Sequence, residues 1–139
     1  MLPESCEFSF CVTKQEMEVF ASLSDDYSLI HTDAAFARLH GFREPIVYGG
    51  ILLAKLSHCL GTRLPGPTGV SLEWLIRYHS PLYVDEAALF RAESRRFSEA
   101  LQVLELVFRV TCGDRKIASG TAQSRILGSF GFLDSPPSR

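Results

Sequence analysis

The sequence predicts an α+β protein in which a curled, antiparallel five-stranded sheet wraps around one central apolar helix. The first observation is the stretch 51–60, which is apolar at nearly every position. A helix that is apolar on almost all sides is one that other structure buries. From residue 69 onward, long segments alternate apolar and polar residues with the period of strands. A shorter alternating segment near the start of the chain supplies the remaining strand.

The length and composition indicate one domain spanning residues 1–139. Hydrophobic residues make up 46% and charged residues 22%, which is typical of a globular protein. The formal net charge of -2 provides no basic field for nucleic acid and no polybasic patch for a membrane surface. No apolar run approaches the roughly 18 residues of a membrane helix. We therefore expect neither nucleic-acid nor membrane binding, and a flexible tail over about 128–139, where Ser and Pro dominate.

The cysteines indicate a reducing compartment. Cys6, Cys11, Cys59 and Cys112 show no zinc-ligand spacing. Alternation along a strand would place Cys6 and Cys11 on opposite faces, where they could not pair. The chain also begins without the basic region and apolar run of a signal peptide. We expect four reduced thiols, no bound metal and a cytoplasmic protein.

The first elements are predicted from alternation and capping residues. Segment 7–13 alternates like a strand, and Thr13 with Glu16 forms the pattern of a capping box. We expect the helix that follows to run to about residue 22, with Met17, Phe20 and Ala21 on one face.

Two further helices are expected. One runs from Asp33 to Leu39, with Thr32 as its N-cap and Gly41 as its stop. The central helix opens at the glycine pair 49–50 and ends at Gly61. The later strands are expected at about 69–79, 87–97, 100–112 and 116–126, joined by hairpins, with a tight turn at 112–115.

The residues that can do chemistry lie between positions 26 and 50. Asp26 and His31 form an acid and a base, and histidine is the natural proton shuttle near neutral pH. The first N–H groups of a helix lack partners and lie at the positive end of the helix dipole. The glycine pair at positions 49 and 50 lets a substrate approach those groups closely. The pattern predicts proton transfer beside a polarised carbonyl. The alternative for Asp26 and His31 is a capped loop with a structural histidine.

These segments resemble a known family. DYSLIHTDAAFA, followed by PIVYGGILLAKLSHCLG and LPG, is similar to the MaoC-like dehydratases, or (R)-specific enoyl-CoA hydratases, of the hot-dog fold. PLYVDE resembles the turn that follows in that family. Four positions match the family signature: Asp26, Ile30, His31 and Asp33. Four positions differ, with Asp25 for the family's Gly before the Asp, Ser28 for its Asn, Leu29 for its Pro, and Tyr48 for the His before Gly49.

The resemblance implies hydration or dehydration of a 2-enoyl thioester carried by coenzyme A or an acyl carrier protein. Asp26 and His31 would activate a water that adds at C3, while a proton is delivered at C2. The N–H of Gly49 would hold the thioester oxygen. No cofactor or metal is implied, and the family works as homodimers whose sheets join edge to edge.

Four more residues are expected near the substrate: Ser28, Tyr48, Gly50 and Ser57. Ser57 matches a small hydroxyl residue that lines the pocket in the family, although such a hydroxyl can instead bond back to its own helix. Tyr48 could equally be an ordinary half-buried tyrosine. Two other functions stay open, a hot-dog acyl thioesterase in which Asp26 activates water, and a non-catalytic module that binds acyl thioesters.

Overall fold

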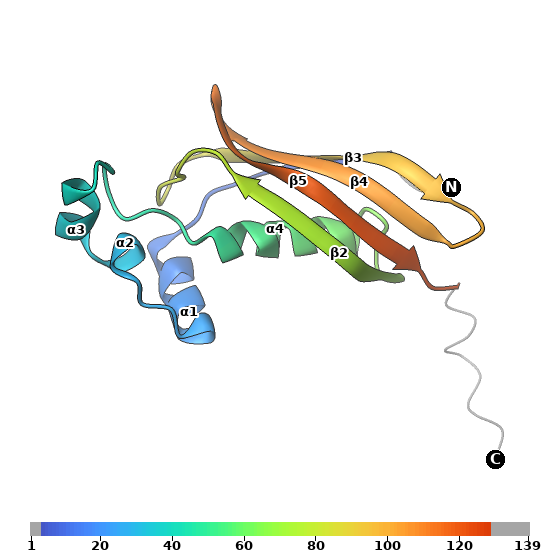
Figure 1. Ribbon diagram of the computed structural model, residues 1–139, viewed down its shortest axis with the longest axis horizontal. Coiled ribbons are helices and arrows are strands. Elements are labelled where there is room, and N and C mark those ends of the chain that lie inside the picture. The colour runs from blue at the N-terminus through green and yellow to red at the C-terminus, as the bar shows by residue number, and fades with distance from the viewer. Residues whose placement is uncertain (1–3, 129–139) are drawn as a thin grey trace, which may run out of the picture.

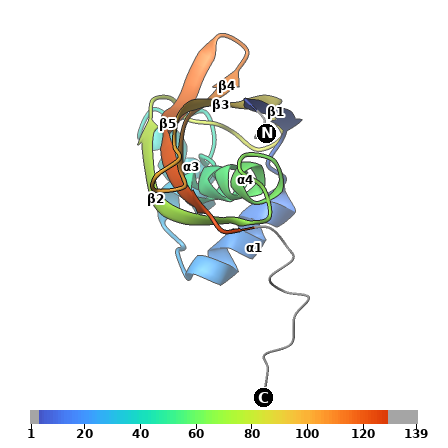
Figure 2. The ribbon, with the colours of Figure 1, turned by 90° about the vertical axis from the view of Figure 1, so that its right-hand side faces the viewer.

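A computed structural model describes residues 4–128, so the tail expected beyond Gly128 lies outside the described residues. One five-stranded antiparallel sheet, in the order β1-β3-β4-β5-β2, lies over a long central helix, α4 (Figure 1). Figure 2, in which α4 is seen nearly end-on, shows the sheet curved around it. The strands are β1 (Ser5–Phe10), β2 (Gly69–Tyr78), β3 (Ala88–Ser98), β4 (Val103–Cys112) and β5 (Arg115–Ile126). The helices are α1 (Lys14–Ser24), α2 (Leu29–Thr32), α3 (Ala34–Leu39) and α4 (Gly49–Thr62).

The core lies between α4 and the concave face of the sheet, as predicted. Leu56 and Cys59 of α4 are fully buried, in one cluster with Phe90 of β3 and Val110 of β4. Burying one such leucine stabilises the fold by roughly 1.5–3 kcal/mol. The wrapping is incomplete within one chain, because Ser57 and its neighbours 54 and 58 on α4 are exposed.

Helix α1 confirms the predicted capping box. The Thr13 hydroxyl accepts from the Glu16 amide at 3.1 Å, and the Glu16 carboxylate accepts from the Thr13 amide at 3.1 Å. Met17 and Ala21 form the buried face. The helix reaches Ser24 rather than residue 22, because the left-handed conformation that ends it falls on Asp25, with φ 57°.

The predicted start of the second helix was wrong by one residue. The carboxylate of Asp33, not the hydroxyl of Thr32, caps α3 by accepting from the Phe36 amide at 2.8 Å. The Thr32 hydroxyl donates instead to the Ser28 carbonyl at 3.1 Å, because Thr32 ends the short helix α2, which the sequence did not predict.

The predicted stop of the central helix was also wrong. Helix α4 continues through Gly61 to Thr62, and the Arg63 amide still donates to the Cys59 carbonyl at 3.0 Å. Gly61 lacks the positive φ that would end the helix, which is found later, at Gly66 with φ 104°.

The strand pairing corrects the expectation of successive hairpins. β3, β4 and β5 do form two hairpins, but β2 pairs with β5 and not with β3. Alternation identifies a strand without identifying its neighbour, and here segment 79–87 carries the chain across from β2 to β3. β2 thereby becomes an edge strand of ten residues with several exposed apolar side chains. Those side chains are Val70, Leu72, Trp74, Leu75 and Tyr78.

The cysteines follow the prediction from alternation. Cys6 is buried and Cys11 is exposed, and both are free thiols, as are Cys59 and Cys112. No helix within residues 4–128 has the length and apolar character needed to cross a membrane.

Two glycines of α4 provide a matched test of how α1 packs against α4. A Cβ on Gly50 would overlap the ring of Phe20 on α1, whereas a Cβ on Gly61 would meet nothing within 4 Å. We expect Gly50→Ala to lower the free energy of unfolding by about 1–3 kcal/mol through overpacking. Gly61→Ala should raise it by about 0.5–1 kcal/mol, because alanine favours the helix. Urea denaturation of both variants measures the difference, and a Gly50→Ala protein as stable as Gly61→Ala would contradict this packing.

Candidate active site

The imidazole of His31 is held by the backbone of a distant segment. His31 lies in α2, and its Nδ1 is 2.8 Å from the carbonyl oxygen of Ile46. A carbonyl can only accept, so Nδ1 carries the proton. In the neutral ring, Nε2 is then left unprotonated and able to act as a base. The Ile46 amide also donates to the Ile30 carbonyl at 3.1 Å, so Ile46 is tied to α2 through both its amide and its carbonyl.

Tyr48 connects His31 to Asp26. Its ring stacks on the His31 imidazole with centroids 4.1 Å apart and an interplanar angle of 27°. Its hydroxyl donates to the Asp26 carbonyl oxygen at 2.7 Å. The side chain is 2% exposed, and burial, with a smaller effect from the Asp26 charge, raises the pKa of Tyr48. Tyr48 therefore stays a protonated donor, and the structure places it beneath the histidine, more deeply buried than the half-buried alternative.

Asp26 is held ionised by its neighbour Ser28. The Ser28 hydroxyl and amide both donate to Oδ1 of Asp26, the amide at 3.0 Å. These two bonds hold the pKa of Asp26 below its usual value. Ser28, expected near the substrate, thus orients the carboxylate. No hydrogen bond in the described part of the chain joins Asp26 to His31; Tyr48 links them.

An apolar cavity of about 380 Å³ lies between His31 and the start of α4. His31 and Gly49 line it, and so does Tyr78, which the sequence analysis missed because it looked like an ordinary alternating strand residue. A second hollow of about 410 Å³, between α1 and α2, is also lined by His31 and Tyr48. Asp26 borders neither space. The other residues around the first cavity are Phe42, Ile46, Val47, Leu52, His79, Ser80, Pro81, Leu82 and Ile117.

Gly49 and Gly50 have different surroundings. Gly49 faces the cavity, and a Cβ there would lie 2.6 Å from the end of the exposed Tyr78 side chain, which would have to move to admit it. Gly50 faces Phe20 instead and serves the packing of α1. Within residues 4–128, neither amide N–H of the pair has a hydrogen-bond acceptor. An unpartnered N–H at a helix start, facing an apolar cavity, can hold a carbonyl oxygen that gains negative charge.

Ser57 lies on the exposed side of α4 and borders neither cavity in a single chain. Other hollows lie on the sheet; the larger, of about 950 Å³, is lined by charged residues of β3 and holds none of the expected site residues. No three His, Cys, Asp or Glu side chains of the described residues come together as metal ligands would.

Comparisons with known proteins identify relatives of the chain. Residues 5–106 match the family model of the MaoC like domain. The chain is 32% identical over 108 residues to the (R)-specific enoyl-CoA hydratase of Aeromonas caviae, covering 77% of this chain and 81% of the relative. It is 24% identical over 115 residues to the 3-hydroxybutyryl-CoA dehydratase of Methylorubrum extorquens, covering 83% of this chain and 73% of that protein.

Solved structures share the fold. The (R)-hydratase from A. caviae involved in PHA biosynthesis superposes with a TM-score of 0.84 at 27% identity, covering 91% of this chain and 97% of that one. The R-hydratase PhaJ1 from Pseudomonas aeruginosa gives a TM-score of 0.81 at 21% identity, covering 100% of this chain and 92% of that one, and supports the fold alone. With a family model matched over most of its length and a relative about one-third identical, the chain belongs to the MaoC-like domain family.

Proposed function

We propose that the protein is an (R)-specific hydratase/dehydratase that interconverts trans-2-enoyl and (R)-3-hydroxyacyl thioesters of coenzyme A or an acyl carrier protein. The observation that carries this proposal is one apolar cavity lined by both His31 and Gly49. Nε2 of His31 is left unprotonated by the bond at Nδ1, and the N–H of Gly49 has no acceptor among residues 4–128. The relatives named above are a hydratase and a dehydratase of coenzyme A thioesters. A further relative, from Arabidopsis thaliana, is named a 3-hydroxyacyl-[acyl-carrier-protein] dehydratase.

In hydration, Nε2 of His31 holds the reacting water, and the proposal requires the Asp26 carboxylate, which borders neither hollow in the single chain, to reach the same water. The pair removes one proton as the water oxygen bonds to C3, and the electron pair of the C2=C3 bond moves toward the thioester oxygen. A proton returned by the pair to C2 completes the addition, and dehydration is the reverse. Acid–base help of this kind contributes roughly 10²–10⁴-fold to the rate.

The charge that develops on the thioester oxygen is stabilised at Gly49. Gly49 lies at the start of α4 and lines a mostly apolar cavity, where one such N–H donor is worth on the order of 3 kcal/mol. The apolar side chains around the cavity, among them Phe42, Val47 and Leu52, accommodate the start of the acyl chain. All of these groups belong to the protein, so the proposed reaction uses no cofactor.

A second copy of the chain completes the site in this proposal. β2 is a long edge strand with unpaired backbone groups and a row of exposed apolar side chains, which favours pairing with another strand. Two copies joined edge to edge along β2 form a symmetric dimer with one continuous sheet. The partner then covers the exposed side of α4 on which Ser57 lies, and Ser57 becomes part of the pocket. The free thiols favour the reducing cytoplasm as the site of action.

Replacing either member of the acid–base pair tests the proposed chemistry. We expect Asp26→Asn and His31→Ala each to lower the hydration rate by roughly 10²–10⁴-fold, because each removes a proton-transfer group. Hydration of crotonyl-CoA, followed by loss of enoyl absorbance, measures the rate, and circular dichroism verifies folding. His40→Ala is the control, since His40 is exposed at the end of α3. Unchanged turnover in either variant would overturn the assignment, and release of free thiol without hydration would indicate a thioesterase.

A charge on the β2 edge tests the dimer. Trp74 lies in the middle of β2 and is 38% exposed. We expect Trp74→Asp to give a monomer in sedimentation equilibrium and to lose most of its activity. Leu101→Asp places the same charge on the exposed turn between β3 and β4 and should leave both properties unchanged. A monomeric parent protein with full activity would contradict the proposal.

A further inference from the structure

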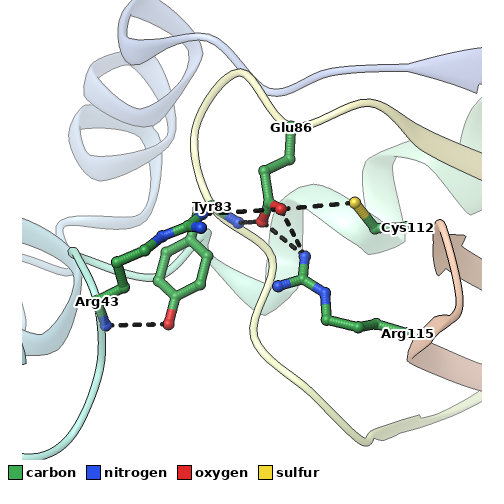
Figure 3. A network of polar contacts seen from close by, with 5 residues as sticks. All are labelled: Arg43, Tyr83, Glu86, Cys112 and Arg115. Carbon is green, nitrogen blue, oxygen red and sulfur yellow. Dashed lines mark hydrogen bonds and ion pairs between the residues drawn. The ribbon is translucent and has the colours of Figure 1, made fainter.

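The residue with the most polar contacts around the proposed site is Glu86, which does not border the cavity itself. Glu86 ends the segment that crosses from β2 to β3, and its side chain is 20% exposed. Figure 3 shows its carboxylate at the centre of a network drawn from three parts of the chain. Arg115, at the start of β5, donates through Nη2 to both carboxylate oxygens at 2.7 Å. Arg43 lies 3.7 Å away and the Cys112 thiol 3.6 Å away.

The same carboxylate holds the backbone at Tyr83. The Tyr83 amide donates to Oε1 of Glu86 at 2.9 Å, and the tight turn between them has Asp85 at φ 65°. The Tyr83 hydroxyl accepts from the Arg43 amide at 3.2 Å, and the Arg43 guanidinium lies 4.5 Å above the Tyr83 ring. Glu86 therefore fixes Tyr83 from its backbone side and, through Arg43, from its side-chain end.

Tyr83 in turn holds the segment that binds His31. Ile46 and Tyr83 form an isolated antiparallel bridge, and the neighbouring Val47 amide donates to the Leu82 carbonyl at 2.8 Å. The carbonyl of Ile46 is the group that accepts from Nδ1 of His31. A continuous path of contacts thus runs from Glu86 through Tyr83 and Ile46 to the imidazole.

The carboxylate is ionised under ordinary conditions. Burial opposes ionisation, but hydrogen bonds from Arg115 and the Tyr83 amide, with the positive charge of Arg115, outweigh it and lower the pKa of Glu86. Because the folded pKa lies below the unfolded one, the stability that this charge contributes is present above the unfolded pKa. It is lost as the pH falls through the folded pKa.

The orientation of the Ile46 carbonyl decides which nitrogen of His31 carries the proton. A carbonyl aimed at Nδ1 keeps the proton there and leaves Nε2 available as the base; a carbonyl turned away allows the other tautomer. We infer that Glu86 is a positioning residue for the acid–base histidine, acting through Tyr83 and the Ile46 carbonyl to select the tautomer of His31. This inference rests on the proposed function only for its effect on the rate, since the tautomer itself is observable without a substrate.

The test replaces Glu86 with its neutral isostere in the full-length protein. We expect Glu86→Gln to change the 15N resonances of His31 from one Nδ1-protonated tautomer to a mixture of two. At the same time kcat for crotonyl-CoA hydration should fall by roughly 10- to 100-fold with little change in KM, because the base is misaligned while the binding surface remains. Arg115→Gln, which removes the main partner of Glu86, should produce the same changes. If Glu86→Gln does not fold, Arg115→Gln is the variant whose resonances and kcat are measured.

Glu93→Gln is the matched control, since Glu93 pairs with Arg91 at 3.0 Å on β3, away from this network. It should leave the His31 resonances and kcat unchanged. His31 resonances that stay at the parent positions in folded Glu86→Gln and Arg115→Gln would overturn the inference, as would an equal change in Glu93→Gln. Absence of hydration by the parent protein would count against the proposed function, while the resonances would still decide the role of Glu86.

Discussion

The packing of the curved sheet against α4 is the constraint on which the site depends. Leu56 and Cys59 are completely buried under the sheet, so α4 cannot slide or rotate without opening the core. Its first residue, Gly49, is consequently held at one place, with Tyr78 of the edge strand directly against it. A rigid helix that presents unpartnered N–H groups to an apolar space needs no rearrangement when charge develops nearby, which is the physical basis of preorganised stabilisation.

The loop that carries Asp26 and His31 has no comparable core of its own and is held by polar contacts. Asp26 and His31 lie on a short, half-exposed stretch between α1 and α3. Tyr48 binds one of them through its hydroxyl and the other through its ring, and the Ile46 carbonyl binds the imidazole. Ile46 and Tyr48 lie just before α4. Their contacts with the loop therefore fix the position of the loop relative to the core. The segment that carries Tyr83 and Glu86 supports the same residues from the opposite side.

The two edges of the sheet differ in a way that bears on assembly. β1 is short, and its exposed face carries Glu7, which pairs with Arg91 at 3.8 Å. β2 is longer and exposes Leu72 and Trp74, while the part of α4 near Ser57 remains uncovered. A charged, short edge discourages pairing with another chain, whereas a long apolar edge favours it. The incomplete burial of α4 and the apolar edge are the two observations that support the proposed dimer.

The sequence by itself determined the elements and the chemical groups. The hydrophobic period identified α4 and the strands, and the Thr13–Glu16 capping box identified α1. The spacing of Asp26, His31 and Gly49 supplied the proposed acid, base and amide. These properties are local, so residues close in the chain are enough to reveal them. The sequence did not reveal the cap at Asp33 or helix α2, because neighbouring Thr and Asp residues compete for the same backbone groups.

Only the tertiary structure decided which groups meet. The pairing of β2 with β5 depends on a crossover that alternation cannot encode, and it is this pairing that brings Tyr78 to Gly49. The group that orients His31 is a backbone carbonyl, which every residue possesses. The identity of the side chain at position 46 therefore could not predict this contact. Glu86 likewise acquires its role from Arg115 and Arg43, which are distant in the chain and adjacent only after the sheet has closed over α4.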